Sequence, residues 1–167
     1  MCVGPPFFLN ESDMSKINPK PKAPPATDPN DARFWDERDL EHEMRRVFEI
    51  CHGCRMCVNY CGSFPDLFGR VDRDIEKRGA EGAEQLDALD LRSVTDLCWQ
   101  CKLCYIDCPY TPDQNHEWAL DFPRLLMRAK AQRAKREGVT LQDTVLGEPG
   151  QLGAAVSQGR IGRCGRW

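Results

Sequence analysis

The sequence lacks the features that would place it in several common protein classes. It contains no apolar run long enough to cross a bilayer, and its mean hydropathy is −0.58, so we expect no membrane-spanning segment. Its 23 Lys and Arg residues do not outnumber its 26 Asp and Glu residues, and without a basic excess we expect no nucleic-acid partner. Residues 1–10 lack the basic stretch of a secretory signal, which predicts a cytoplasmic location.

Cysteine is what the chain has in excess. Ten cysteines occur among 167 residues, and eight of them form two quartets whose members are separated by two, two and three residues. The first quartet is Cys51, Cys54, Cys57 and Cys61, and the second quartet is Cys98, Cys101, Cys104 and Cys108. In a reducing compartment such thiols stay free to bind metal. The repeated spacing therefore predicts one kind of metal site used twice.

The spacing favours two [4Fe–4S] clusters. Three cysteines separated by two residues can wrap one face of an iron–sulfur cube, and the fourth cysteine then points away from that face. In bacterial two-cluster proteins this fourth cysteine binds the other cluster. The predicted ligands are Cys51, Cys54, Cys57 and Cys108 for the first cluster, and Cys98, Cys101, Cys104 and Cys61 for the second.

Other uses of the cysteines fit the spacing less well. A structural zinc site uses two pairs of cysteines and leaves the third cysteine of each loop without a role. A disulfide framework needs an oxidising compartment, and a redox dithiol needs only two cysteines. Cys2 and Cys164 lie outside the quartets and His52 stands beside a ligand, but both sets of four are complete without them.

The remaining sequence predicts an all-α domain between irregular tails. Residues 1–33 are rich in proline, lysine and asparagine, a composition typical of a disordered or extended arm. Residues 34–140 show helical periodicity around the two Cys loops and no strand alternation. Residues 141–167 are rich in glycine and predict an irregular tail. The domain with both clusters is therefore expected at residues 34–140.

Local signals place the helices around the loops. One helix is expected to begin at the N-cap Asp36, and a second to begin at Ser63 and stop at Gly79. The last is expected over residues 118–137, where Pro123 marks either a kink or a first turn. We expect the apolar residues inside the loops to shield the clusters from water. They are Met56, Val58, Leu103, Tyr105 and Ile106.

The two loops and their long helical spacer resemble the α-helical ferredoxin family, over residues 34–140. Residues 51–57 and 98–104 carry the match, which is most similar to the C subunits of heterodisulfide reductase and of anaerobic glycerol-3-phosphate dehydrogenase. The iron–sulfur subunit of glycolate oxidase is a near relative of these. Gly62 stands where many members have proline, and the Cys-rich C-terminal domains of longer members do not follow. We therefore expect a truncated member or a stand-alone electron carrier.

The resemblance implies an electron-transfer subunit without catalytic residues of its own. Through two [4Fe–4S] clusters it would relay electrons between a flavoprotein dehydrogenase or reductase and a downstream acceptor such as a quinone. The sequence contains no nucleophilic triad, phosphate-binding glycine loop or carboxylate pair that suggests other chemistry. Two alternatives stay open: an iron–sulfur redox or iron sensor, and a zinc-stabilised interaction module.

A run of basic residues lies on the last predicted helix. Its members are Arg124, Arg128, Lys130, Arg133, Lys135 and Arg136. Such a run is usually a solvated face. The sharper interpretation is a docking surface for the flavoprotein or for the inner face of the membrane.

Overall fold

The computed structural model describes residues 18–79 and 81–158, and every regular element in those ranges is a helix. The predicted all-α class is confirmed there, and none of these helices is long and apolar enough to cross a bilayer. The chain divides into two units, one ending at Gln132 and the other beginning at Arg133. The elements up to this boundary are η2 (Ala32–Trp35), α1 (Glu37–Cys54), α2 (Ser63–Arg78), η3 (Ala83–Gln85), α3 (Ala88–Asp96), α4 (Leu103–Ile106), η4 (Pro112–Gln114) and the larger part of α5 (Phe122–Glu137).

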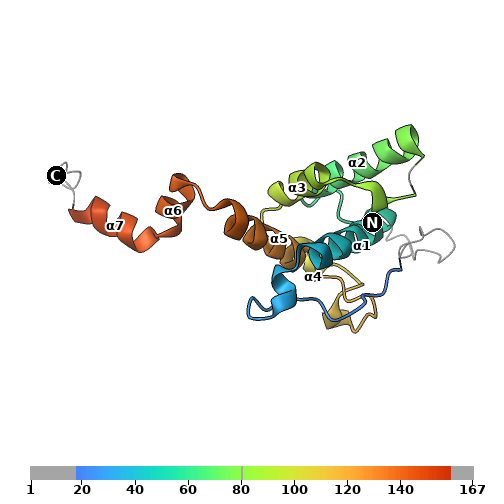
Figure 1. Cartoon of the computed structure of the whole chain (residues 1–167), viewed down its shortest axis with the longest axis horizontal. Coiled ribbons are helices and arrows are strands. Elements are labelled where there is room, and N and C mark those ends of the chain that lie inside the picture. Colours follow the sequence, from blue (N-terminus) through green and yellow to red (C-terminus); the bar gives the residue numbers. More distant parts are fainter. Residues whose placement is uncertain (1–17, 80, 159–167) are drawn as a thin grey trace, which may run out of the picture. The chain divides into compact units, whose positions relative to one another are not determined.

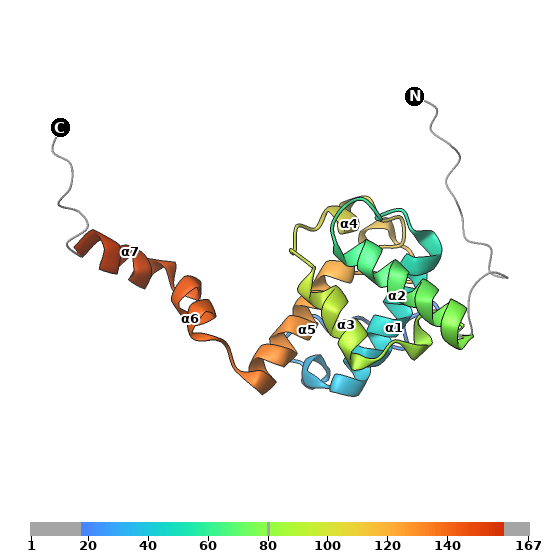
Figure 2. The same ribbon diagram turned by 90° about the horizontal axis from the view of Figure 1, so that it is seen from above.

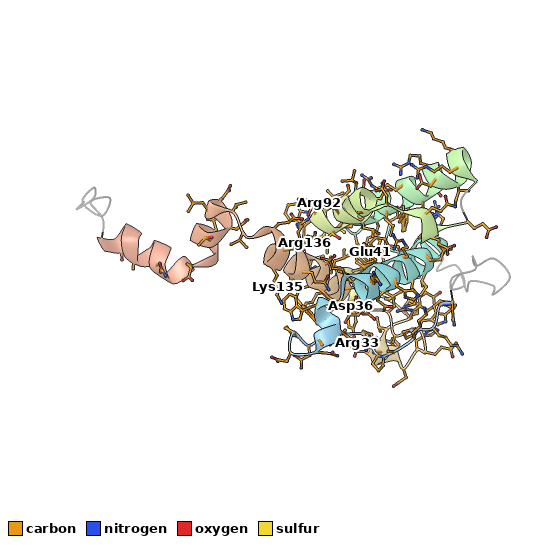
Figure 3. The ribbon with its side chains drawn as sticks, in the orientation of Figure 1. Arg33, Asp36, Glu41, Arg92, Lys135 and Arg136 are labelled. Carbon is orange, nitrogen blue, oxygen red and sulfur yellow. The ribbon has the colours of Figure 1, made fainter. Side chains whose placement is uncertain are left out.

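Helix α1 begins where the sequence predicts it. The Asp36 carboxylate accepts hydrogen bonds from the backbone N–H groups of Arg38 and Asp39 at 2.9 and 3.2 Å, which caps the first turn. Figure 3 labels Asp36 at this end of α1. Its apolar side chains at helical spacing are buried; they are Leu40, Met44, Val47 and Phe48. These side chains anchor α1 in the core, and the first Cys loop begins in the last turn of the helix.

Helix α2 packs against both α1 and α3, as Figures 1 and 2 show. Leu67 and Val71 of α2 and Val94 of α3 are completely buried in the shared core. The predicted cap at Ser63 is shifted by one residue, since Gly62 is the N-cap. The Ser63 hydroxyl instead donates to the backbone carbonyl of Val94 at 3.0 Å, which ties the start of α2 to α3.

A polar network also joins α2 to α3. Arg70 donates to Asp90 at 2.5 Å, to Asp66 at 2.8 Å and to the Ser93 hydroxyl at 2.8 Å. Burial alone would raise the pKa of the Asp90 carboxyl, but the hydrogen bonds from Arg70 and Arg73 outweigh it and lower that pKa below its usual value. Asp90 is therefore ionised and paired at neutral pH.

Helix α5 begins at Phe122, later than predicted, and Pro123 lies in its first turn. Two of its polar side chains are buried and hold the chain ahead of α1. Arg128 Nε donates to the Phe34 carbonyl at 2.9 Å, and Gln132 Nε2 donates to the same oxygen at 2.5 Å. Arg128 also pairs with Asp39 at 2.9 Å. The basic run is therefore not one solvated face, because the Arg128 side chain is buried and bonded to groups of the core.

The proline-rich segment preceding η2 has no helix in its described part, residues 18–31, but it contacts the body of the first unit. Arg46, which is completely buried, donates to the Pro19 carbonyl at 2.5 Å and to the Trp118 carbonyl at 3.0 Å. Lys20 pairs with Glu117 at 2.9 Å. Residues 1–17 of the expected arm lie outside the described residues.

The second unit contains the end of α5 and two short helices, α6 (Leu141–Gly147) and α7 (Pro149–Gln158). The glycine content predicts irregular structure here, and two local signals account for the difference. The Thr140 hydroxyl accepts from the Asp143 backbone at 3.1 Å, and the Asp143 carboxylate accepts from the Thr140 backbone at 3.2 Å, so a capping box starts α6. Pro149 is the first residue of α7, where its missing N–H costs nothing.

Candidate functional site

Both Cys loops lie at helix ends in the first unit. Cys51 and Cys54 occupy the last turn of α1, and Cys57 and Cys61 lie in the turn that leads to α2. In the second quartet, Cys98 follows α3, Cys104 lies in α4 and Cys108 follows that short helix. The eight cysteines of the quartets are all free thiols. Cys2 and Cys164 lie outside the described residues.

The two loops share a backbone feature that the spacing alone does not reveal. Arg55 and Lys102, each directly after the second cysteine of its quartet, both have left-handed backbone conformations, with φ of 53° and 64°. Non-glycine residues enter this region at a cost and cluster at functional sites. At Arg55 the left-handed residue ends α1, and at Lys102 it precedes α4. The second and third cysteines of each loop are therefore separated by the same sharp turn.

One cavity collects thiols from both loops. Its lining includes all four predicted ligands of the first cluster, and Cys104 joins them; the set is Cys51, Cys54, Cys57, Cys104 and Cys108. The rest of the wall is mainly apolar and aromatic, and includes Ile50, Phe64, Tyr110, Leu120 and Phe122. Thiols in a pocket of this kind are shielded from water on the protein side. The structure thus brings Cys108 to the first loop, as the exchanged ligand requires.

Electrostatic interactions between the thiols give the same grouping for the first set. Burial raises the pKa of Cys51 well above its usual range, and the Cys108 thiol is the strongest of the charged neighbours that raise it further. Burial also raises the pKa of Cys57 to about 12, and there too Cys108 is the leading neighbour. Cys108, the last cysteine of the second quartet, is therefore the thiol with the largest effect on Cys51 and Cys57 of the first loop.

The second set shows the exchange less sharply. Burial raises the pKa of Cys104 to about 12, and the thiols that add to this rise are, in order of effect, Cys57, Cys98, Cys61 and Cys101. Two of these neighbours, Cys57 and Cys61, belong to the first quartet. Cys61 is therefore near the second loop, and the leading place of Cys57 shows that the two sets lie close to each other. Mutual repulsion of this kind is relieved when bound iron neutralises the thiolates.

The donor set fits iron–sulfur clusters better than a single metal ion. Within the described ranges, no three Cys, His, Asp or Glu side chains are arranged to hold one ion. A tetrahedral zinc site would bring its sulfurs to about 2.3 Å from one centre. In a cubane each thiolate binds a different iron, so the four sulfurs surround a larger cage. The five thiols that line the cavity are donors of the kind that such a cage requires.

Other side chains complete the surroundings of the thiols. The Tyr60 hydroxyl donates to Asp107 at 2.6 Å, and this hydrogen bond raises the pKa of Tyr60 to about 12. Burial raises the pKa of Tyr110 to about 12, and the Cys54 thiol beside it adds to the rise. His52, predicted to be no ligand, has Nε2 at 2.9 Å from the carboxylate of Asp72.

Comparison with known proteins places these loops in a family. Residues 43–136, more than half of the chain, match the citrate utilization protein B Fer4-like domain. The chain belongs to this family. Membership indicates a ferredoxin-like iron–sulfur protein with a role in electron transfer. The finer resemblance to heterodisulfide reductase C subunits is not what the comparison found and stays a prediction.

The Fer4-like domain is similar to citrate utilization protein B of Escherichia coli. The two are 27% identical over 90 residues, which make up 54% of this chain and 20% of that protein. The chain thus aligns with about a fifth of its curated relative. No solved structure matches it.

Sequence reasoning missed several residues around the site of this Fer4-like domain. Tyr110 and Leu120 line the cavity although neither lies inside a Cys loop, and Lys130 reaches the second loop from α5. Of the apolar loop residues expected to shield the clusters, Met56 lines the cavity although its side chain is 53% exposed, whereas Ile106 is 67% exposed and does not line it. Part of the wall comes from residues outside the loops, such as Phe64 and Phe122, which a local pattern does not identify.

Proposed function

We propose that this chain holds two [4Fe–4S] clusters and passes electrons between a flavoprotein oxidoreductase and a downstream acceptor such as a quinone. The ligand sets are those predicted from the spacing: Cys51, Cys54, Cys57 and Cys108 for one cluster, and Cys98, Cys101, Cys104 and Cys61 for the other. Each cluster, when bound, supplies a one-electron redox couple. The chain itself binds, orients and shields that group.

The observation that carries the proposal is the position of Cys108. It lines one cavity with the first three cysteines, and it is the leading thiol neighbour of both Cys51 and Cys57. Two independent zinc knuckles would leave the fourth cysteine with its own loop. Exchange of the fourth cysteine supports two cubanes in one domain.

The accessibility of the two sets supports a relay. Cys101 is exposed, whereas Cys98 and the wall of the cavity formed by Ile50, Phe64 and Phe122 are buried. An electron carrier needs insulated centres with one edge near a partner, and the exposed loop at Cys101 provides such an edge. The absence of a catalytic constellation among the sequence motifs agrees with a carrier rather than an enzyme.

The test is reversible reduction of the anaerobically purified chain, followed by electron paramagnetic resonance. A carrier should give paramagnetic signals on reduction with dithionite and lose them when a water-soluble quinone is added, without loss of iron. Mixing with a reduced flavoprotein should restore them. Reduction that destroys the clusters, or clusters that no quinone or flavin can oxidise or reduce, would contradict the relay and favour a structural role.

A further inference from the structure

The second Cys loop receives hydrogen-bond donors from side chains outside the ligand set. Gln100 Nε2 donates to the sulfur of Cys98 at 3.3 Å. Gln100 has a left-handed backbone conformation, with φ of 59°, so its side chain folds back over the cysteine two residues earlier. Hydrogen bonds to ligand sulfur are one of the main ways in which a protein sets the reduction potential of an iron–sulfur cluster.

A positive charge is held at the same cysteine. Lys130 Nζ donates to the backbone carbonyl of Cys98 at 2.6 Å and reaches it from α5, 32 positions along the chain. The side chain is only partly exposed, so water screens its charge less than on the open surface. Lys130 is thus a member of the basic run that contacts the second Cys loop, and this contact explains its position.

The first set has different surroundings. The Asp107 carboxylate lines the same cavity as Cys57 and accepts a hydrogen bond from the Tyr60 hydroxyl at 2.6 Å. The cavity of this set is walled by apolar and aromatic residues such as Phe64 and Leu120. A carboxylate and an apolar wall both disfavour additional negative charge. The second set has the exposed Cys101, the cation and the sulfur hydrogen bond instead.

We infer that Gln100 and Lys130 raise the reduction potential of the cluster on the second set above that of the cluster on the first. Reduction adds one negative charge, and a nearby cation and N–H donor stabilise it whereas a carboxylate opposes it. An electron shared between the two sets then resides mainly on the second, next to the exposed Cys101. This inference rests on the proposed function, since it requires both clusters to be bound.

The experiment is a potentiometric titration of the full chain, loaded with iron and sulfide under anaerobic conditions and monitored by electron paramagnetic resonance. Lys130→Met removes the charge and Gln100→Glu replaces the donor with a carboxylate of the same shape. Each should lower the higher midpoint potential and leave the lower one in place. A tenfold change in the ratio of reduced to oxidised cluster at fixed potential, about 59 mV for one electron, is the upper range expected for one such group.

Controls separate charge from folding. Lys77→Met makes the same substitution at the exposed end of α2 and should move neither potential, and Lys130→Arg should keep the native potentials because it keeps the charge. Unchanged potentials in both test variants, or shifts confined to the lower potential, would overturn the inference. So would loss of iron without a shift, which would make the residues supports of the loop. Wild-type chain that binds fewer than two clusters would instead refute the proposed function.

Discussion

The hydroxyl of Tyr60 donates to the carboxylate of Asp107 at 2.6 Å, across 47 positions of sequence. Tyr60 directly precedes Cys61, and Asp107 directly precedes Cys108. The bond therefore joins the two loops next to their fourth cysteines, the pair that the proposed ligand sets exchange. It gives the exchange a physical support that does not depend on bound iron.

Removing this bond should loosen the exchanged cysteines. In Tyr60→Phe the ring stays and the donor is lost, so iron should pass to an external chelator severalfold faster than from the wild type, with little change in melting temperature. The loss of iron is followed by the visible absorbance of the clusters. Tyr105→Phe is the matched control, because the Tyr105 hydroxyl interacts with Asp113 rather than bridging to the first loop. Equal rates in Tyr60→Phe and wild type would show that the bond does not hold the loops.

Single serine substitutions test which cysteine serves which cluster. Cys108→Ser should damage the cluster held by Cys51, Cys54 and Cys57, because Cys108 lies against these thiols. Cys61→Ser should damage the other cluster in the same way. The spectra of the two variants, compared with the wild type, should therefore lose different components. If Cys108→Ser removes only the signals of the cluster on Cys98, Cys101 and Cys104, the ligands are not exchanged.

The two clusters should differ in their resistance to oxygen and chelators. Cys101 is exposed, whereas Cys51 is half-buried and lines the cavity with Phe64 and Tyr110. During controlled exposure to air, about half of the iron should therefore be lost in a faster phase. In Cys61→Ser that phase should shrink, because its cluster is already damaged. A single phase for all the iron would argue against the difference in shielding.

The pair of Arg70 and Asp90 predicts a loss of stability in acid. The pKa of Asp90 is lowered in the folded chain, so its contribution to stability is complete above the unfolded value of about 3.9 and is lost as the pH falls through the lower folded pKa. Asp90→Asn should lower the free energy of unfolding at pH 7 by about 1.5–3 kcal/mol and flatten its fall in acid. Urea unfolding between pH 7 and pH 3 measures both.

Glu76→Gln provides the comparison for this prediction. It makes the same acid-to-amide change at an exposed position of α2, and should shift stability at pH 7 by less than about 0.5 kcal/mol. If Asp90→Asn behaves like Glu76→Gln at every pH, the polar network between α2 and α3 does not contribute as its geometry implies.

The sequence was a good guide to helices and a poorer guide to their edges. Asp36 caps α1 as expected, and Gly79 ends α2 in a left-handed conformation with φ of 63°. Both signals are local, because a cap and a terminating glycine act within one turn. Ser63 does not cap α2, since its hydroxyl bonds to Val94. Ile75 is 38% exposed although it follows the buried Leu67 and Val71 at helical spacing. The hydrogen-bond partner of Ser63 and the exposure of Ile75 depend on tertiary packing, which a local sequence signal does not contain.

The candidate site divides in the same way. Cysteine spacing identified the thiols, and the two-cluster pattern predicted which loop each fourth cysteine would approach. The contacts of Gln100, Lys130 and Tyr60 could not be read from spacing, because each depends on a backbone turn or on a partner far along the chain. Lys130 is one of several basic residues on α5, and the packing of that helix determines that Lys130 contacts the Cys98 carbonyl.

Iron and sulfide analysis of the anaerobically purified chain tests the central claim most directly. Two cubane clusters predict about eight iron atoms and about eight acid-labile sulfides per chain, without stoichiometric zinc. Combined replacement of Cys51, Cys54 and Cys57 by serine should leave about half of each. Stoichiometric zinc without sulfide, or a chain that binds neither iron nor sulfide while folded, would contradict the account.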